Sequence, residues 1–286
     1  MPSSSASIFA MPHLSETEFR RLARLVEDRA GIRMPANKRV MLEGRLRHRL
    51  RKRGMRNFAE YCRFLFEEGG LDQELSDLID AVTTNKTDFF REPQHFDFLV
   101  DQALPDLVKR GVGMAQPLRV WSAGCSIGAE PYTLAMVLAE QKTVWLGLRF
   151  HILATDICTT VLQTAAKAIY AEEMAEPIPL EVRRRYLLKS RNRADKLIRI
   201  APEVRAQIAF QQLNFMDEEY HLPHLQDVVF CRNVIIYFDA GVRAKVLSRI
   251  CRSIAREGYL FMGHSETIAG LDLPLRQVAS TVYIRI

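Results

Sequence analysis

The chain has 286 residues, enough for one large domain or two modest ones. Its 48% hydrophobic and 26% charged residues are typical of a soluble globular protein, and no apolar run approaches the ~18 residues of a membrane span. The five cysteines are odd in number and form no C-x-x-C pair, which favours reduced thiols in a cytoplasm over disulfides or a zinc site. A net charge of +6 and a pI near 9.1 indicate an acidic partner.

The first part of the chain is predicted to be helical, without a strand. Residues 1–12 lack the basic start and long apolar core of a signal peptide and are expected to form a disordered tail. Ser15 and Glu18 are spaced as a capping box, and an amphipathic helix should follow and end at Gly31. Further helices are expected at about 37–53, 58–68 and 71–84.

The predicted helix at about 37–53 carries eight basic residues and one acid, Glu43. This pattern has two interpretations, a solvated charged face or an electrostatic dock for an acidic surface. An acidic protein helix is at least as good a candidate partner as nucleic acid. No aromatic residues alternate with the basic ones, and no zinc-finger or RRM signature occurs in the chain.

Residues 83–93 lead from the last of these helices through polar residues and an aromatic pair to a proline. One interpretation is a capped loop between helices, anchored by Phe89 and Phe90. The other is a site loop whose polar side chains contact a ligand, namely Asn85, Thr87 and Arg91. Composition leaves both open. A helix at 96–110 follows, so the helical N-terminal domain is expected to span 13–112.

The segment 118–132 is the centre of the predicted second domain, 113–286. Val120 and Trp121 suit a buried strand, the small residues after them suit a tight turn, and a helix opens near Gly128. A strand, a small-residue turn and a helix form the first unit of a doubly wound sheet, which binds ligands beyond the carboxyl ends of its strands. The dinucleotide fingerprint G-x-G-x-x-G is absent, so a packed junction without a ligand is the alternative.

The rest of the chain continues the α/β pattern. A strand at 148–154 is followed by Asp156, whose carboxylate could accept two hydrogen bonds from a ribose diol or cap the next helix. A small antiparallel hairpin is expected as an insert at 182–211, and its edge could accept a strand from a partner. Strands are also predicted at 209–213, 227–231 and 259–262, with a final strand pair at the C-terminus.

Polar side chains follow several of the predicted strands, and they are Glu130, Asp156, Asn214 and Asn233. The strand ends of an open sheet converge on one crevice, and this crevice lacks a Walker A lysine motif. It therefore suits a nucleoside with few or no phosphates. Asp156 would bind the ribose, Asn214 an adenine edge, and Glu130 an ammonium or a hydroxyl group. S-adenosylmethionine fits these requirements.

Five segments together resemble the chemotaxis receptor methyltransferases, the CheR family. They are residues 84–92, 120–132, 154–157, 230–238 and 263–266, in family order, and the resemblance extends from about residue 13 to the end. It implies an α/β fold, a Rossmann-like class I S-adenosylmethionine-dependent methyltransferase domain with a small antiparallel β-subdomain insert. An all-α N-terminal domain is implied to precede it.

The resemblance also implies the residues of the site. Those implied to contact the cofactor are Asn85, Thr87, Arg91, Glu130, Asp156, Asn214, Phe215, Arg232 and Asn233. In the family an arginine matching Arg91 and a tyrosine matching Tyr237 lie beside the departing methyl group, which implies catalytic roles. The basic helix resembles the family's receptor dock, here with Lys38, Arg39, Arg45, Arg49, Lys52 and Arg53. The insert resembles the part that in some members binds a receptor tail peptide, although its turn at 189–196 lacks the glycine that such members often have.

The function implied is methyl transfer from S-adenosyl-L-methionine to glutamate carboxylates of chemoreceptors, leaving S-adenosyl-L-homocysteine, without a metal. We expect a cytoplasmic monomer with no nucleic-acid partner and no membrane insertion. Nucleobase and amine methyltransferases often carry a proline pair after the fourth strand, and residues 232–235 have none. The alternatives are a cofactor-sensing adaptor with little turnover and an RNA-binding methyltransferase that uses the basic helix.

Overall fold

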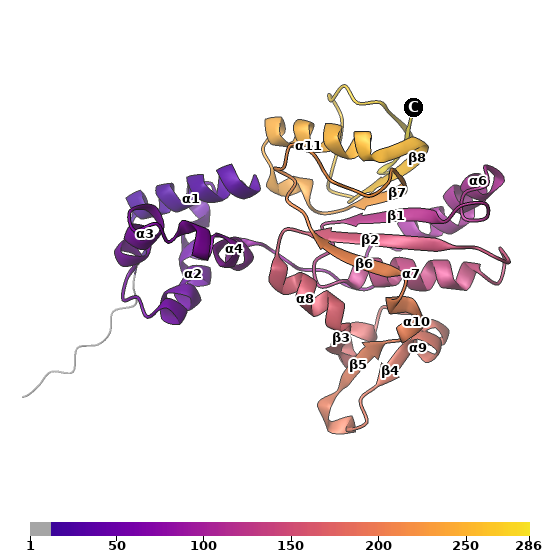
Figure 1. Ribbon diagram of the computed structural model, residues 1–286, viewed down its shortest axis with the longest axis horizontal. Coiled ribbons are helices and arrows are strands. Elements are labelled where there is room, and N and C mark those ends of the chain that lie inside the picture. The colour runs from indigo at the N-terminus through magenta and orange to yellow at the C-terminus, as the bar shows by residue number, and fades with distance from the viewer. Residues whose placement is uncertain (1–12) are drawn as a thin grey trace, which may run out of the picture. The chain divides into compact units, whose positions relative to one another are not determined.

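The computed structural model describes residues 13–286, which form two compact units divided between Thr83 and Thr84 (Figure 1). The first unit is helical and the second is an α/β unit. The tail expected at 1–12 lies outside the described residues. No helix within residues 13–286 is long and apolar enough to cross a membrane.

Four α-helices and a short 3₁₀ turn make up the first unit, and none of its described residues forms a strand. The elements are α1 (Glu16–Ala30), η1 (Ala36–Lys38), α2 (Arg39–Arg53), α3 (Phe58–Phe66) and α4 (Leu71–Val82). The predicted capping box is confirmed, because the Ser15 side chain accepts the Glu18 N–H and the Glu18 carboxylate accepts the Ser15 N–H. Apolar side chains buried in this unit include Leu22, Leu42, Leu46, Phe58 and Leu78.

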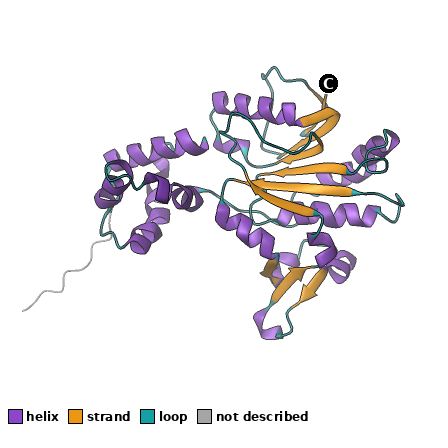
Figure 2. Ribbon diagram, viewed as in Figure 1, coloured by secondary structure: helices purple, strands orange, loops and turns teal. Residues whose placement is uncertain are grey.

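The second unit is built on a seven-stranded sheet in the order β6-β2-β1-β7-β8-β10-β9 (Figure 2). The parallel strands are β1 (Leu118–Ala123), β2 (Phe150–Asp156), β6 (Ile208–Gln212), β7 (Gln226–Cys231) and β8 (Ile254–Met262). The antiparallel strands at one edge are β9 (Leu275–Ala279) and β10 (Val282–Arg285). The strand order reverses between β1 and β7, which is where sheets of this kind bind ligands.

Helices cover both faces of this sheet. Successive strand residues point to opposite sides, and in the central strands both sets are apolar and buried. Val120 and Phe230 belong to one buried cluster, and Trp121 and Val229 to another. The first cluster includes residues of α5 (Gln94–Phe98), a π-helical turn (Leu99–Ala103), α6 (Leu104–Lys109) and α7 (Ala129–Gln141). The second includes residues of α11 (Ala240–Ser253), and α8 (Thr159–Lys167) packs against β2 and β6.

The division between the units falls between Thr83 and Thr84, and not near residue 112 as the sequence suggested. The helical segment from α5 to α6 belongs to the α/β unit because Phe96 and Leu104 are buried in the same cluster as Val120 of β1. A helical pattern alone does not show which neighbour its apolar face will pack against.

A second, three-stranded antiparallel sheet has the order β3-β5-β4. Its strands and flanking elements are β3 (Ile169–Ala171), η3 (Glu172–Ala175), α9 (Leu180–Tyr186), β4 (Leu187–Lys189), η4 (Arg193–Asp195), β5 (Leu197–Ile200) and α10 (Pro202–Arg205). The predicted hairpin around 189–196 is present as β4 and β5. However, residues 182–186 are helical, and β6, which the predicted insert at 182–211 included, pairs with β2 in the main sheet.

Candidate active site

The turn between β1 and α7 is anchored on the end of β2. The N–H groups of Gly124 and Cys125 both donate to the Thr155 carbonyl at 2.8 Å. Gly124 has a φ of 86°, and a Cβ there would lie 2.5 Å from Cγ2 of Val234, so glycine is required. Ser126 has a φ of 52°, which is uncommon for a residue with a side chain. The sequence therefore places a constrained turn between the ends of β2 and β7.

Asp156, the last residue of β2, receives hydrogen bonds from two loops. Its Oδ2 accepts the Ser126 N–H at 2.8 Å, and its Oδ1 accepts the Cys158 N–H at 3.0 Å. The second bond runs to Cys158, the N-cap residue of α8, and so fixes the chain where that helix begins. The Leu213 N–H donates to the Asp156 carbonyl at 3.0 Å, which brings Asn214 to the same end of the sheet. Two residues predicted for the site thus lie beside the turn.

The loop at 84–92 borders the same turn. The Ser126 hydroxyl donates to the Asn85 carbonyl at 2.8 Å, and Asn85 Nδ2 contacts Cys158 Sγ at 3.7 Å. Phe89 is buried in the core of the α/β unit. Both interpretations of this loop describe part of the structure, since it is anchored by an aromatic side chain and also lines the strand ends.

Arg91 lies between two residues in left-handed backbone conformations. Phe90 has a φ of 54° and Glu92 a φ of 56°, values that the surrounding structure must impose on residues with side chains. The Phe90 N–H donates to Thr133 Oγ1 at 3.1 Å, which fixes the loop on α7. The Arg91 side chain is half-buried and donates to the Lys86 carbonyl at 3.2 Å. Hydrogen bonds thus hold both the loop backbone beside Arg91 and its guanidinium group.

Arg232 connects the loop to α7. Its Nε donates to Glu130 Oε2 at 2.7 Å, while Ser122 Oγ donates to the other oxygen of Glu130 at 2.7 Å. Its Nη1 donates to the Arg91 carbonyl at 2.7 Å. The guanidinium also lies over the ring of Phe96, at 5.2 Å from its centroid. Arg232 is thus a buried link between the first turn of α7 and the loop that carries Arg91.

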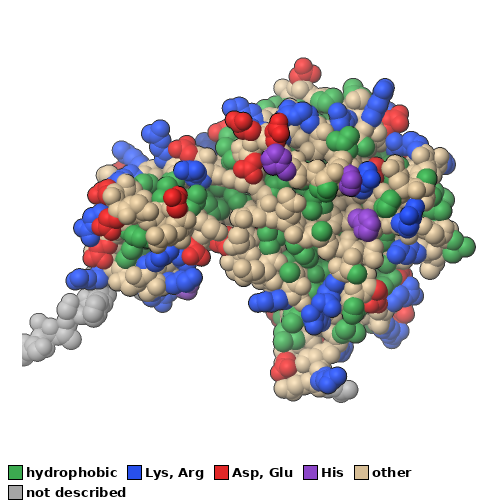
Figure 3. Space-filling view, in the orientation of Figure 1, with side chains coloured by type: hydrophobic (Ala, Val, Ile, Leu, Met, Phe, Trp, Pro, Cys, Tyr) green, Lys and Arg blue, Asp and Glu red, His purple; other side chains and the backbone are tan. Residues whose placement is uncertain are grey.

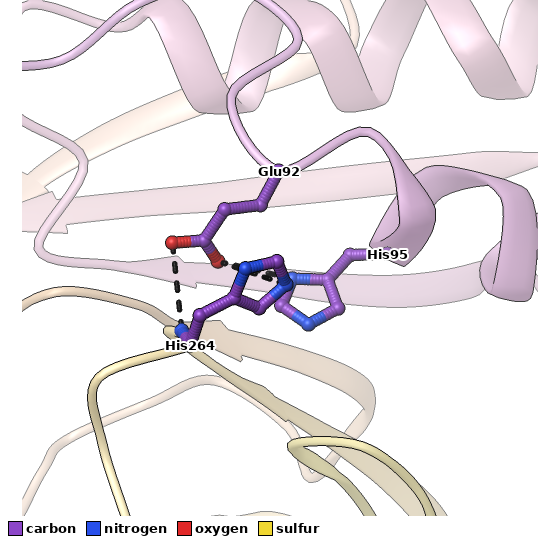
Figure 4. A group of neighbouring side chains, drawn as sticks. All are labelled: Glu92, His95 and His264. Atoms are coloured by element: carbon purple, nitrogen blue, oxygen red, sulfur yellow. Dashed lines mark hydrogen bonds and ion pairs between the residues drawn. The ribbon is translucent and has the colours of Figure 1, made fainter.

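Glu92, His95 and His264 form a cluster (Figure 4), and Arg232 contacts two of its members. Glu92 Oε2 lies 3.4 Å from His95 Nδ1 and 4.0 Å from His264 Nε2. Burial and the charge of Arg232 lower the pKa of His95 to about 4, so its ring is neutral near pH 7. His95 Nδ1 accepts from Arg232 Nη1 at 3.1 Å, and Nε2 donates to Thr281 Oγ1 at 2.9 Å.

The geometry of this cluster would allow the carboxylate and the two rings to share a cation. However, the Arg232 guanidinium already lies 3.1 Å from His95 Nδ1 and 3.6 Å from Glu92 Oε2. A metal ion would therefore meet a positive charge beside two of its three ligand atoms. The arrangement serves better as a clamp that holds the backbone around Arg91.

Glu266 is a residue of the site that sequence reasoning did not assign. Its buried carboxylate accepts four N–H groups, from Asn233, Val234, Ile235 and Gly263, at 2.7–3.0 Å. Burial raises the pKa of Glu266, and the four donors oppose that shift. The carboxylate thereby shapes the segment after β7. The sequence did carry a signal for this role. Glu266 is an acid that follows the buried strand β8, much as Asp156 ends β2.

The remaining predicted residues lie around the same strand ends. Asn233 has a φ of 59°, and its Nδ2 donates to Glu92 Oε1 at 3.3 Å. Tyr237 is half-buried at the end of η5 (Ile235–Tyr237), which follows directly. Thr87 is half-buried in its loop. Phe215 is mostly buried in the apolar cluster on the α11 side, so little of its ring is open to a ligand.

The basic helix α2 is less available to a partner than its sequence suggests. Arg49 is only 4% exposed, and its guanidinium donates to Glu74 at 2.7 and 2.8 Å, so its assignment as a docking residue was wrong. It lies on the buried side of α2 together with the neighbouring leucines. Half-buried side chains that bind within the unit are Lys38 (to the Arg33 carbonyl), Arg45 (to the Val82 and Thr83 carbonyls) and Arg53 (to Glu74). Arg39 and Lys52 are exposed.

A parallel sheet with a reversal between β1 and β7, a glycine turn after β1 and an acid at the end of β2 define a Rossmann-like domain that binds its ligand at the strand ends, the class to which S-adenosylmethionine-dependent methyltransferases belong. Comparison with protein families supports this class. Residues 85–284 match the CheR methyltransferase SAM binding domain, and residues 17–83 match the CheR methyltransferase all-alpha domain. The chain therefore belongs to the CheR methyltransferase family, as its motifs predicted. The two matches meet where the structure divides the chain.

Curated relatives extend over nearly the whole chain. A chemotaxis protein methyltransferase of Borreliella burgdorferi is 37% identical over 260 residues, which cover 90% of this chain and 90% of that protein. A chemotaxis protein methyltransferase of Escherichia coli is 37% identical over 270 residues, covering 94% of this chain and 91% of that protein. Similarity of this extent includes both units of the molecule.

Proposed function

We propose that this enzyme transfers the methyl group of S-adenosyl-L-methionine to glutamate side chains of chemoreceptors, giving methyl esters and S-adenosyl-L-homocysteine. The observation that carries the proposal is the linkage of Arg91, Glu130 and Arg232 at the strand ends. It joins Arg91, whose guanidinium suits a carboxylate substrate, to the turn between β1 and α7 that borders Asp156. The names of the relatives support a receptor of chemotaxis as the substrate.

The residues at the strand ends fit the cofactor. Asp156 presents a carboxylate for the ribose diol, and the Gly124 turn permits close approach of the backbone. Glu130, shared between Ser122 and Arg232, carries the negative charge that suits the amino group of the methionine part. We also assign cofactor contacts to Asn85, Thr87, Asn214, Phe215 and Asn233, of which Phe215 offers least because it is mostly buried. The cofactor supplies an electrophilic methyl group on a sulfonium.

The acceptor needs little activation. A glutamate has an unperturbed pKa of about 4.3, so it is ionised near pH 7 and needs no strong general base. The protein must instead orient the carboxylate and remove water from it. We infer that Arg91 binds the incoming carboxylate, since arginine forms charge-assisted bonds in the carboxylate plane. We also assign the hydroxyl of Tyr237, in the segment after β7, to help position it.

The partner surface is assigned to the helical unit and the small β-sheet. Exposed Arg39 and Lys52 of α2 suit the acidic methylation helices of a receptor. β4 is an edge strand of the small sheet. An extended receptor tail could pair with its outer edge and add a further strand to the sheet. The proposal includes a monomer that works in the cytoplasm, without a metal.

The test is a transfer assay with methyl-tritiated S-adenosyl-L-methionine and receptor fragments that carry or lack their C-terminal tails. We expect label in the fragment that base releases as volatile methanol, because a methyl ester is base-labile. Cofactor binding without labelled receptor would support the adaptor alternative. Base-stable label in RNA would support the RNA alternative, and either result would refute the proposal.

A further inference from the structure

The connection between α7 and β2 exposes neighbouring apolar side chains. Val144 is 65% exposed and Leu146 is 79% exposed, and Trp145 between them is half-buried. Single exposed apolar residues are ordinary on a soluble protein, whereas a contiguous group points to an interaction surface. Hydrophobic side chains reach the surface at this edge of the α/β unit, with Lys and Arg side chains nearby (Figure 3).

A second loop contributes to this surface. Met114 is 37% exposed, and a Cβ on Gly147 would lie 3.9 Å from its Cε, so the two loops are in contact. Arg149 Nη2 donates to the carbonyls of Met114 and Ala115 at 2.9 and 3.0 Å, which holds the loops together. The resulting surface, Met114, Val144, Trp145 and Leu146, is called the apolar edge patch below.

The chain around the apolar edge patch is basic. Residues 109–119 and 140–149 contain one acid, Glu140, and five basic residues: Lys109, Arg110, Arg119, Lys142 and Arg149. Glu140 already pairs with Arg185 at 2.6 Å, and Arg110 pairs with Asp106 and Glu257. Lys109, Lys142 and Arg149 are exposed. A partner of this edge should therefore carry negative charge and also accept apolar side chains.

We propose that the apolar edge patch is a peripheral docking surface for an anionic lipid bilayer. Exposed Val and Leu beside an amphipathic Trp suit the boundary between headgroups and acyl chains. Adjacent Lys and Arg suit the negative surface potential of anionic lipids. An acidic protein surface would match the charges, but a bilayer matches both the charges and the neighbouring exposed apolar side chains.

The position of the patch is compatible with catalysis. It precedes Leu118 of β1 and Phe150 of β2, at the amino ends of these strands (Figure 1). The candidate active site lies at their carboxyl ends, around Ala123 and Asp156. Docking through the patch would leave the site open, so the surface adds to the proposed activity without depending on it.

The test is co-sedimentation of the full chain with vesicles of phosphatidylcholine, with and without phosphatidylglycerol. We expect binding to the anionic vesicles, weakening with added salt, and a blue shift of Trp145 fluorescence. The double variant Val144→Ser/Leu146→Ser should lower partition by about tenfold or more, because it removes two side chains that would be buried in lipid. Leu180→Ser, a matched change at a 56% exposed residue of α9, should leave partition unchanged.

Three results would overturn the proposal. One is no binding to anionic vesicles at low salt, including the case in which an acidic protein binds this edge instead. Another is equal binding to neutral and anionic vesicles. The third is full binding by Val144→Ser/Leu146→Ser, since charge alone would then account for it. If the double variant misfolds, the single variants Leu146→Ser and Lys142→Glu replace it. Each should also bind anionic vesicles more weakly than the parent chain, and thermal unfolding checks that each is folded.

Discussion

Each unit of the molecule buries an arginine against a glutamate. In the helical unit Arg49 donates to both carboxylate oxygens of Glu74 at 2.7 and 2.8 Å, and Arg53 and Tyr61 donate to the same carboxylate. In the α/β unit Arg232 donates to Glu130 at 2.7 Å. Both arginines are less than 9% exposed, so the two pairs differ in their connections more than in their burial.

The connections suggest different roles. The donors to Glu74 come from α2 and α3, so that pair ties together helices of a closed bundle. Burial would raise the pKa of Glu74, but its hydrogen bonds hold it below the ordinary value. Arg232 instead links α7, the loop at Arg91 and the segment after β7. The same side-chain chemistry thus stabilises a fold in one place and positions a candidate site in the other.

The largest expected effect is on the group that the Arg232 link positions. Arg91→Ala should lower methyl transfer on the order of 10³-fold, because the carboxylate loses its charged partner. Affinity for S-adenosyl-L-homocysteine should be largely kept, since the backbone of the loop stays held by Arg232. Single-turnover transfer and calorimetry measure the two quantities, with Arg91→Lys as the charge-conserving comparison. Full activity of Arg91→Ala would refute the assignment.

The pair in the helical unit should affect stability and not the site. Glu74→Ala should lower the free energy of unfolding by about 3–5 kcal/mol, because buried Arg49 loses its bidentate partner and keeps only the part-exposed Asp77. Cofactor affinity of the folded protein should not change. Glu67→Ala removes an exposed partner of Arg21 in the same unit and is the control, with little expected loss. Urea unfolding provides the measurement, and equal losses in the two variants would contradict the prediction.

Glu130→Gln tests the pair in the α/β unit, where we expect a loss of cofactor affinity and a smaller loss of stability. The change keeps the shape of the side chain but removes its charge, so affinity for S-adenosyl-L-homocysteine should fall roughly tenfold to hundredfold, from the typical 1.5–3 kcal/mol of a charged hydrogen bond. The free energy of unfolding should fall less than in Glu74→Ala. Glu140→Gln alters another glutamate of α7, paired outward with Arg185, and should leave affinity unchanged. If Glu130→Gln lost stability but kept its affinity for S-adenosyl-L-homocysteine, the pair would be structural like Arg49 and Glu74, and the prediction would be wrong.

His95 makes the clamp around Arg91 sensitive to acid. Its pKa is lowered from 6.5 to about 4 by burial and by Arg232 and His264, while Glu92 opposes the shift. The unfolded chain therefore binds more protons between these values, and the free energy of unfolding must fall as the pH drops from about 6.5 towards about 4. His95→Gln should remove about 1–3 kcal/mol of that decline. Urea unfolding at about pH 7 and about pH 4.5 measures it, and an unchanged decline would exclude His95 as its source.

The smallest expected effect concerns Tyr237. Removing its hydroxyl in Tyr237→Phe should lower methyl transfer by about tenfold or less, the scale of one neutral hydrogen bond. The ring remains, so stability and cofactor affinity should stay close to those of the parent. Steady-state transfer with saturating cofactor measures the change. A loss as large as that of Arg91→Ala would mean that Tyr237 does more than position the acceptor.

Much of the candidate site could be predicted from local sequence. The strand, small-residue turn and helix at 118–132 and the acid after the next strand are short patterns with a direct physical meaning. Several motifs in one order also identified the family. The contacts themselves could not be predicted, since Glu266 accepts four N–H groups that come from two segments of the chain.

The sequence by itself determined the class of fold, the family and most residues at the strand ends, because these depend on periodicity and on motifs within one stretch of chain. Only the tertiary structure decided where the units divide, which strands form the small sheet, and that Arg49 is buried while Arg39 is exposed. Those outcomes depend on which apolar faces meet. A basic residue on a helix becomes a structural ion pair or a free surface charge according to the neighbour that packs against it.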